Sequence, residues 1–309
     1  LMAAASPVRA PVRRRVLSCV TLCDFLIRQM RTNRMHIQPL GAAIGAEVSA
    51  MDAGDRIASE DAQALRDALA RYALLVFRDQ QMTEEAQLRF TRVFGEPEVH
   101  VRAQSGSHLP GIFIVSNIVE NGKSIGALGH EEVGFHSDLA YLEKPGSIST
   151  LYAVEVPDAG GDTSWCGASV AAEQLATETK RRLIGERAVH QHVSEELNPA
   201  SPVTHPVLCK HPITGRPVLF VTPLFTRSIE GMDAAESDVL LRELTSHLRQ
   251  PEFIWTHHWR PGDLVVWDNR ASMHSRAAFA DNTRRLMKRT QVFCQQRPIP
   301  WTMENEHEN

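Results

Sequence analysis

Short runs of apolar and β-branched residues recur along the chain, and most of them are bounded by Gly, Pro or Asn. Runs of this length between turn-forming residues are typical of β-strands. We therefore expect strands at residues 73–79, 111–117, 147–156, 216–221, 263–268 and 286–293. These strands are too many and too unevenly spaced for a repeated βαβ unit.

Four other segments carry helix start signals ahead of periodic apolar residues. Ser59, Thr83 and Ser169 stand at the start of three of them, and Asp233 with Glu236 forms a capping box before the fourth. We expect helices at residues 59–72, 83–94, 169–186 and 233–248. Together with the strands, these helices favour a mostly antiparallel barrel or sandwich that carries helices on its outside.

The chain after Met35 contains no linker, repeat or low-complexity stretch, so residues 35–309 are expected to form one domain. The first 34 residues differ, because they hold seven arginines, one acidic residue and a short apolar stretch. We interpret residues 1–34 as a leader that is disordered or that was annotated ahead of the true start at Met35. A signal or transit peptide is the alternative.

The composition is that of a globular protein, with 43% hydrophobic and 23% charged residues in a chain of 309. A chain of this length buries about three quarters of the surface that its unfolded form exposes, so its stability requires neither disulfides nor a structural metal. Any metal is therefore expected to serve chemistry. The formal charge of −4, without a basic block in the body of the chain, argues against nucleic acid as a partner and favours a small molecule.

The five cysteines are scattered without any paired C-x-x-C spacing, which indicates reduced thiols in a cytoplasmic protein. The longest apolar run lies at residues 16–27 and contains Asp24. A membrane-spanning helix needs about twenty apolar residues. We therefore expect no transmembrane segment and no membrane partner.

One short motif offers metal ligands. His136 and Asp138 are two residues apart, so an extended strand would point both side chains to one face, where both can reach one metal ion. The pair is a weak signal alone, because chance places such pairs in a chain with 14 histidines. His130 and Glu132 offer the same spacing nearby, and the residues downstream favour His136 over this rival.

His274 is the candidate for the third ligand and follows the strand expected at 263–268. Two histidines and one carboxylate on one face of an octahedron leave three adjacent positions open, as in non-haem Fe(II) oxygenases. A 2-oxo acid can take two of these positions through its keto and carboxylate oxygens, and dioxygen the last. The other histidines weighed here are expected to be hydrogen-bonded core or surface groups: His205, His211, His257 and His258.

Two arginines follow His274 on the strand expected near the C-terminus. Arg285 lies eleven residues after His274, and Arg289 lies four residues further on, so the two share one face of an extended strand. Burying such a pair is costly without anionic partners, and capture of a carboxylate is the natural use of a guanidinium. An exposed edge strand with solvated arginines is the alternative.

These residues together resemble the Fe(II)/2-oxoglutarate-dependent taurine and 2,4-dichlorophenoxyacetate dioxygenase family. The similarity extends from about residue 39 to about residue 298 and consists of several ordered motifs at the family's spacing. The motifs are His136-Ser-Asp138, Gly160-Gly-Asp-Thr163, Trp267-Asp-Asn-Arg270 with His274, and Arg285 with Arg289. The resemblance implies a double-stranded β-helix, a jelly roll of the cupin kind, with flanking helices.

The resemblance also implies a role for each matching residue. His136, Asp138 and His274 would hold Fe(II), while Arg285 and Thr163 would bind the distal carboxylate of the cosubstrate 2-oxoglutarate. Arg289 matches the family position that meets the anionic head of the prime substrate or the metal-side carboxylate of the cosubstrate. Substrate contacts are also implied for His100 and Phe225, the latter as an aromatic wall.

The implied reaction is hydroxylation of a small organic substrate with O2, which releases succinate and CO2. An anionic substrate is expected: a sulfonate, a sulfate ester, or an aryloxy or alkyl carboxylate. The chain departs from the taurine enzymes at Ala103, where they carry a pocket tyrosine, which argues against taurine itself. Family members commonly assemble as homodimers or homotetramers. A redox-inactive zinc hydrolase and a non-catalytic small-molecule binder on the same fold are the two alternatives.

Overall fold

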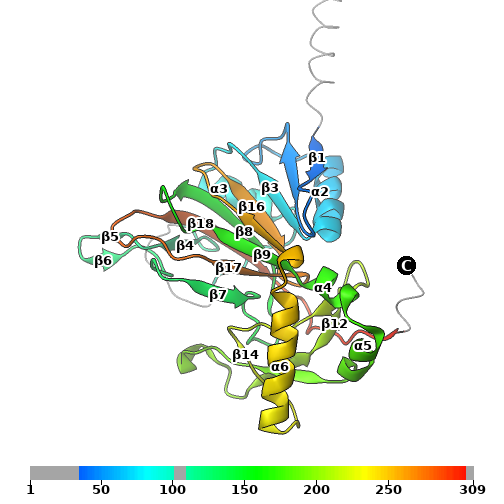
Figure 1. The fold of residues 1–309 in the computed structure, drawn as a ribbon. Helices are drawn as coiled ribbons and strands as arrows, with labels where there is room; N and C mark the ends of the chain where they lie inside the picture. The colour runs from blue at the N-terminus through cyan, green and yellow to red at the C-terminus, as the bar shows by residue number, and fades with distance from the viewer. Residues whose placement is uncertain (1–34, 101–108, 304–309) are drawn as a thin grey trace, which may run out of the picture.

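Two β-sheets face each other in the computed structural model, which describes residues 35–100 and 109–303 (Figure 1). The larger sheet has seven strands in the order β1-β2-β3-β16-β8-β18-β4. Their bounds are β1 His36–Pro39, β2 Ala46–Ser49, β3 Leu74–Phe77, β16 Leu264–Asp268, β8 Gly146–Glu155, β18 Leu286–Phe293 and β4 Phe113–Ser116. All of its pairings are antiparallel except the one between β2 and β3.

The smaller of the two facing sheets has four antiparallel strands in the order β15-β9-β17-β7. Their bounds are β15 Ile254–His257, β9 Thr163–Gly167, β17 Ser272–Arg276 and β7 Val133–His136. The two sheets form the jelly roll that the sequence predicts, in which side chains between the sheets are removed from water.

Three smaller sheets complete the strands. They are β11-β10-β14 (Val203–Pro206, Arg187–His190, Thr226–Ile229), β12-β13 (Leu208–Lys210, Pro217–Leu219) and β5-β6 (Val119–Glu120, Lys123–Ser124). The helices are α2 Ser59–Tyr72, α3 Glu84–Thr91, α4 Ala168–Gln174, α5 Thr177–Leu183 and α6 Ala234–Leu248, with short 3-10 turns at Glu195–Leu197 and Pro251–Phe253. In Figure 1, α2 lies against the end of the large sheet formed by β1 to β3, and α6 lies at the opposite end of the molecule.

All six strands expected from apolar runs are present, as β3, β4, β8, β13, β16 and β18. The five residues of β16 are all buried because it lies between β3 and β8. Strands that are buried on both faces appear in the sequence as continuous apolar runs. The strand β18 pairs with both β8 and β4, so it is not the exposed edge strand of the alternative interpretation.

The helix predictions need two corrections. The segment expected as one helix over 169–186 is two helices, because Leu175 and Ala176 are extended between α4 and α5. The start signals at Thr83 and Asp233 are confirmed, since their side chains accept backbone hydrogen bonds in the first turns of α3 and α6. Ser59 and Ser169 are not caps, because Ser59 is the first helical residue after Ala58 and Ser169 is the second helical residue after Gly167.

The described cysteines, Cys166, Cys209 and Cys294, are free thiols. None of the helices within the described residues has the length and apolar character needed to cross a bilayer. The predicted leader at residues 1–34 and the departure from the taurine enzymes at Ala103 lie outside the described residues.

Candidate active site

The strand β7 delivers His136 to the space between the two sheets. It ends at His136, so the expectation that His136 and Asp138 lie on one continuous strand is only half right. Asp138 comes from the turn that follows, and its Oδ1 still lies 3.8 Å from Nε2 of His136. The turn requires a left-handed backbone at Leu139, which has φ 57°.

His274 comes from β17, the neighbouring strand, where it pairs directly with His136 across the ladder. Its Nε2 lies 4.0 Å from Asp138 Oδ1. One ligand atom from each of the three side chains lies within 4.8 Å of the others, and all three residues are buried. The structure thus brings together three residues that lie up to 138 positions apart in the chain.

Hydrogen bonding fixes which nitrogen of His136 faces its partners. Its Nδ1 lies 2.8 Å from the carbonyl oxygen of Gly134, and because a carbonyl only accepts, Nδ1 carries the proton. The lone pair is therefore on Nε2, on the side of Asp138 and His274, as a metal-ligating histidine requires. The ring of His274 packs 4.9 Å from that of Trp267, and its buried Nδ1 has no hydrogen-bond partner.

Asp138 is held by three neighbours. Ser149 donates to its Oδ2 at 2.8 Å, Arg289 donates to its Oδ1 at 3.2 Å, and its backbone N–H donates to the side-chain oxygen of Asn269. Burial alone would raise the pKa of Asp138, but the charge of Arg289 and the hydrogen bond from Ser149 contribute to a pKa well below the usual range. The carboxylate is therefore ionised at neutral pH.

Burial acts on the two histidines in the opposite direction. It lowers the pKa of His136, and it lowers the pKa of His274 to about 3. Both imidazoles are therefore neutral at pH 7 while the carboxylate is charged. These are the protonation states in which the three groups bind a divalent cation, so the donor set fits a metal of the Fe(II) kind.

A cavity next to this cluster holds the predicted cosubstrate residues. Arg285, Thr163 and Arg289 line it together with His136 and His274. Arg285 is 1% exposed, and its buried Nε and Nη1 have no hydrogen-bond partner. Thr163 accepts a hydrogen bond from the indole of Trp259, which leaves its hydroxyl proton for another acceptor.

The predicted substrate residues lie close to the cluster. Arg289 Nη2 donates to Nε2 of His100 at 2.9 Å, and its guanidinium lies 4.8 Å from the centroid of the Phe113 ring. Phe225 packs edge-on against His136 with ring centroids 5.6 Å apart. These contacts place a cation, an imidazole and an aromatic wall beside the three candidate ligands.

The other histidines and the rival ligand pair considered in the sequence lie outside this cluster of metal ligands. Glu132 is exposed, and the His130 pair is not part of the cluster of ligand atoms. The other histidines have structural partners: His205 with the Leu142 carbonyl, His211 with Asp268, His257 with Asp263, and His258 with Asp162.

Sequence reasoning missed the residues that hold the ligands in place. Asn269 is the main one, because its side chain binds the Asp138 backbone, the Trp267 indole and the Ser149 hydroxyl. It belongs to the Trp267-Asp-Asn-Arg270 motif, which was recognised in the sequence although no role was predicted for Asn269. Arg276 was also missed, although it stands two residues after His274 and lines the same cavity.

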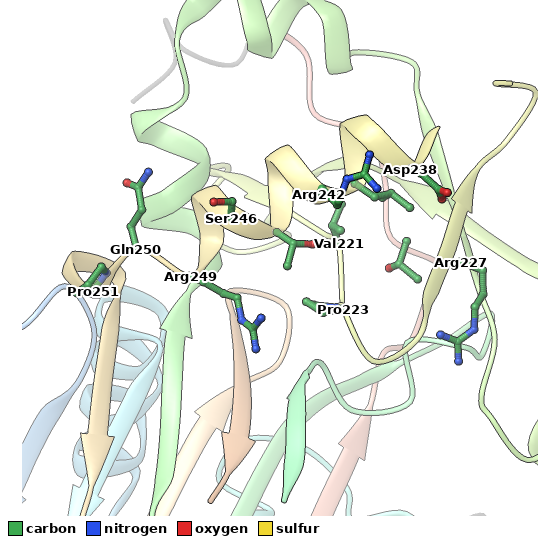
Figure 2. A pocket seen from close by; sticks show the side chains of 12 residues that line it. Val221, Pro223, Arg227, Asp238, Arg242, Ser246, Arg249, Gln250 and Pro251 are labelled. Atoms are coloured by element: carbon green, nitrogen blue, oxygen red, sulfur yellow. The ribbon is translucent and has the colours of Figure 1, made fainter. Parts of the chain in front are cut away.

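A second hollow lies away from these residues. A groove with a volume of about 700 Å³ lies between α6 and the segment that leads into β14. Figure 2 shows Arg242 on α6, Arg249 directly after the helix, and Arg227 across from them. Its lining shares no residue with the cavity of the metal-ligand cluster. The chemistry of the predicted site therefore does not extend to this groove.

Comparisons with known proteins agree with the geometry. Residues 36–291 match the model of the family described as "Taurine catabolism dioxygenase TauD, TfdA family". Pentalenolactone F synthase of Streptomyces arenae is 30% identical over 87% of this chain and 99% of its own length. The alpha-ketoglutarate-dependent 2,4-dichlorophenoxyacetate dioxygenase of Burkholderia sp. (strain RASC) is 32% identical over 70% of this chain and 80% of its own length.

Solved structures give the same result. A crystal structure of a putative alpha-ketoglutarate-dependent taurine dioxygenase from Burkholderia xenovorans superposes with a TM-score of 0.76 at 29% identity, covering 86% of this chain and 92% of its own. The chain therefore belongs to the taurine catabolism dioxygenase TauD, TfdA family and is a 2-oxoglutarate-dependent dioxygenase, an oxidoreductase.

Proposed function

We propose that the protein hydroxylates a small anionic organic molecule with Fe(II) held by His136, Asp138 and His274. The observation that carries this proposal is the buried cluster of two neutral imidazoles and one ionised carboxylate, whose ligand atoms lie within 4.8 Å of one another. Fe(II) bound there supplies the electrons that activate O2 while 2-oxoglutarate is converted to succinate and CO2.

The chain's own residues bind and orient the two organic molecules. Arg285 and Thr163 bind the distal carboxylate of 2-oxoglutarate, because a buried guanidinium without an acidic partner requires an anion. Arg289 and His100 bind the anionic head of the substrate, or Arg289 serves the metal-side carboxylate of the cosubstrate. Phe225 forms a wall that keeps water from the reacting carbon.

The proposed substrate class follows from the charge of Arg289 and from the substrates in the names of similar proteins. We propose a sulfonate, a sulfate ester, or an aryloxy or alkyl carboxylate. An aryloxy carboxylate is the substrate in the name of the 2,4-dichlorophenoxyacetate dioxygenase. The guanidinium of Arg289 beside His100 supports an oxyanion at this position, since a guanidinium carries five N–H donors.

We further propose that residues 35–309 form one domain in the cytoplasm, working on a small molecule without nucleic acid or membrane partners, as a homodimer or homotetramer. One buried apolar cluster contains residues of both facing sheets, such as Val265 of β16 and Trp165 of β9, which supports a single domain. The free thiols support a reducing compartment.

The function is tested by supplying purified protein with Fe(II), 2-oxoglutarate and O2 and measuring succinate against a panel of sulfonates, sulfate esters and aryloxy acids. We expect at least one panel member to raise succinate formation and to be converted to a hydroxylated product, or to the carbonyl compound and the phenol, sulfate or sulfite into which that product breaks down. Succinate no higher than in the His136→Ala variant would reject the proposal. Turnover of an ester without O2 and 2-oxoglutarate would instead support a zinc hydrolase.

A further inference from the structure

Arg276 is a buried cation that none of the roles above uses. It ends β17, two residues after His274, and pairs across the ladder with Thr163 of β9. Neighbours at i and i+2 and directly opposite residues share one face of a sheet. Arg276 therefore lies on the inner face with His274 and Thr163, and it lines the same cavity as Arg285.

Hydrogen bonds hold the guanidinium of Arg276 in one orientation. Its Nη1 donates to the carbonyl of Leu128 at 2.6 Å, and its Nη2 donates to the carbonyl of Glu131. Its Nε is buried and has no partner. Leu128 has a left-handed backbone with φ 65°, a conformation that a branched side chain rarely adopts, so the surrounding contacts hold this segment in place.

Arg276 and Arg285 form a pair of like charges. Their guanidinium carbons lie 5.3 Å and 5.9 Å from the centroid of the same ring, that of Phe279. Within residues 35–100 and 109–303, neither arginine forms an ion pair with an acidic side chain, in contrast to Arg289 with Asp138. Burial, together with the charge of Arg276, lowers the pKa of Arg285 to about 9, so both remain protonated at neutral pH.

Two buried cations without counter-charges are costly, and an anion between them offsets both desolvation and repulsion. Three nitrogen atoms lack partners here: Nε of Arg276 and Nε and Nη1 of Arg285. A carboxylate has two oxygens and about four acceptor sites, which is enough for all three. The distal carboxylate of 2-oxoglutarate is the anion that the proposed function brings to this cavity.

We propose that Arg276 is a second cation for the distal carboxylate of 2-oxoglutarate, acting beside Arg285. The inference rests on the proposed function. Arg276 makes the cavity selective for a 2-oxo diacid over a 2-oxo monoacid, because its charge stabilises only the acid that carries a distal carboxylate. Its bonds to the segment at 128–131 keep that charge in place before the cosubstrate arrives.

The test compares two ligands on protein loaded with Mn(II), which binds like Fe(II) without turnover. The affinities of 2-oxoglutarate and of 2-oxopentanoate, which has a methyl group instead of the distal carboxylate, are measured by calorimetry. For Arg276→Gln we expect the 2-oxoglutarate affinity to fall about tenfold, as for loss of a charge-assisted contact, and the 2-oxopentanoate affinity to stay unchanged. Arg276→Lys should recover part of the loss.

The control is Arg284→Gln. Arg284 precedes Arg285 in the chain, but its cation is exposed and paired with Glu155. We expect both affinities to match the wild type. Thermal melting checks that each variant is folded, and Arg276→Met, which also removes the charge, carries the test if Arg276→Gln does not fold. An equal loss of affinity for both acids, or unchanged selectivity in a folded variant that lacks the charge, would overturn the role of Arg276.

Failure of the proposed function gives a different result. Wild-type protein that binds neither acid, or that does not prefer the diacid, would contradict the cosubstrate site as a whole. If the wild type prefers the diacid and Arg285→Gln loses that preference while Arg276→Gln keeps it, only the role of Arg276 is wrong.

Discussion

Single residues decide the charge of this site. Three arginines line the cavity between the sheets, and of these only Arg289 forms an ion pair with an acidic side chain among the described residues, that of Asp138. The cavity therefore carries an excess of positive charge before any metal is bound. Anionic cosubstrates and substrates offset such an excess, whereas neutral ones leave buried charges unbalanced.

The first residue-scale prediction concerns Ser149, whose hydroxyl donates to Asp138 and accepts from Asn269. Ser149→Ala should lower Mn(II) affinity about tenfold, because groups that orient a ligand from behind typically contribute that much. The measurement is a competition titration with a chelator. Ser275→Ala is the control, since Ser275 lies between His274 and Arg276 on the strand and alternates to the other face. Equal affinities for the two variants would contradict this account.

Arg289 gives a second prediction. Arg289→Gln should raise the KM for the anionic substrate about tenfold or more, with a smaller effect on 2-oxoglutarate affinity, if its main partner is the substrate head. The loss of its charge should also raise the pKa of Asp138. As the pH is lowered, Asp138 is then protonated earlier, and metal binding weakens at a higher pH than in the wild type. A change confined to 2-oxoglutarate affinity would assign Arg289 to the cosubstrate instead.

At the scale of elements, the strands that sequence could predict are the apolar ones. The strands β3 and β16 are buried on both faces and read as unbroken apolar runs. Three strands of the small sheet, β9, β15 and β17, were not predicted as strands, and polar site residues interrupt two of them: Thr163 in β9, and His274 with Arg276 in β17. Of these polar residues, His274 was nevertheless recognised from the sequence as a candidate metal ligand, whereas Arg276 was not.

Contacts between distant loops could not be predicted. The orientation of Arg276 depends on hydrogen bonds to carbonyl groups almost 150 residues earlier in the chain. Because every residue has a backbone carbonyl, the sequence does not indicate which of them Arg276 contacts. The break between α4 and α5 was missed for a similar reason, because Leu175 and Ala176 are acceptable helix residues that tertiary packing holds extended.

The element-scale prediction concerns the N-terminus of α6. The carboxylate of Asp233 accepts from the backbone N–H groups of Ala235 and Glu236. Asp233→Ala should lower the free energy of unfolding by about 1 kcal/mol, the usual contribution of such a cap. Urea denaturation measures it, with Asp238→Ala, an exposed site within the same helix, as the control. A loss no larger than that of the control would show that the cap contributes nothing.

At the scale of the whole molecule, burial of neutral histidines links stability to pH. Burial lowers the pKa of His190 to about 3 and that of His205 to about 4, from an ordinary value of 6.5. Below pH 6.5 the unfolded chain takes up protons that the folded chain does not, so the free energy of unfolding decreases as the pH is lowered. The free energy of unfolding should drop by up to about 1.4 kcal/mol per pH unit for each group between about pH 6.5 and 4.

This pH dependence is measured by urea denaturation at several pH values for the wild type and for His205→Gln. The variant lacks one of the buried histidines that take up a proton on unfolding, so its stability should fall less steeply as the pH decreases from 6.5. Parallel curves for the two proteins would contradict the assignment of the slope to His205.

The whole fold serves to bring His136, Asp138 and His274 together with an anion site behind them, and one spectroscopic measurement tests this most directly. Purified protein is mixed with Fe(II) and 2-oxoglutarate without oxygen, and the visible charge-transfer band of the chelate is recorded. We expect the band in the wild type and its loss in His274→Ala, because the metal then lacks one of its three protein ligands. A wild type without the band, or a His274→Ala variant with the band unchanged, would contradict the account.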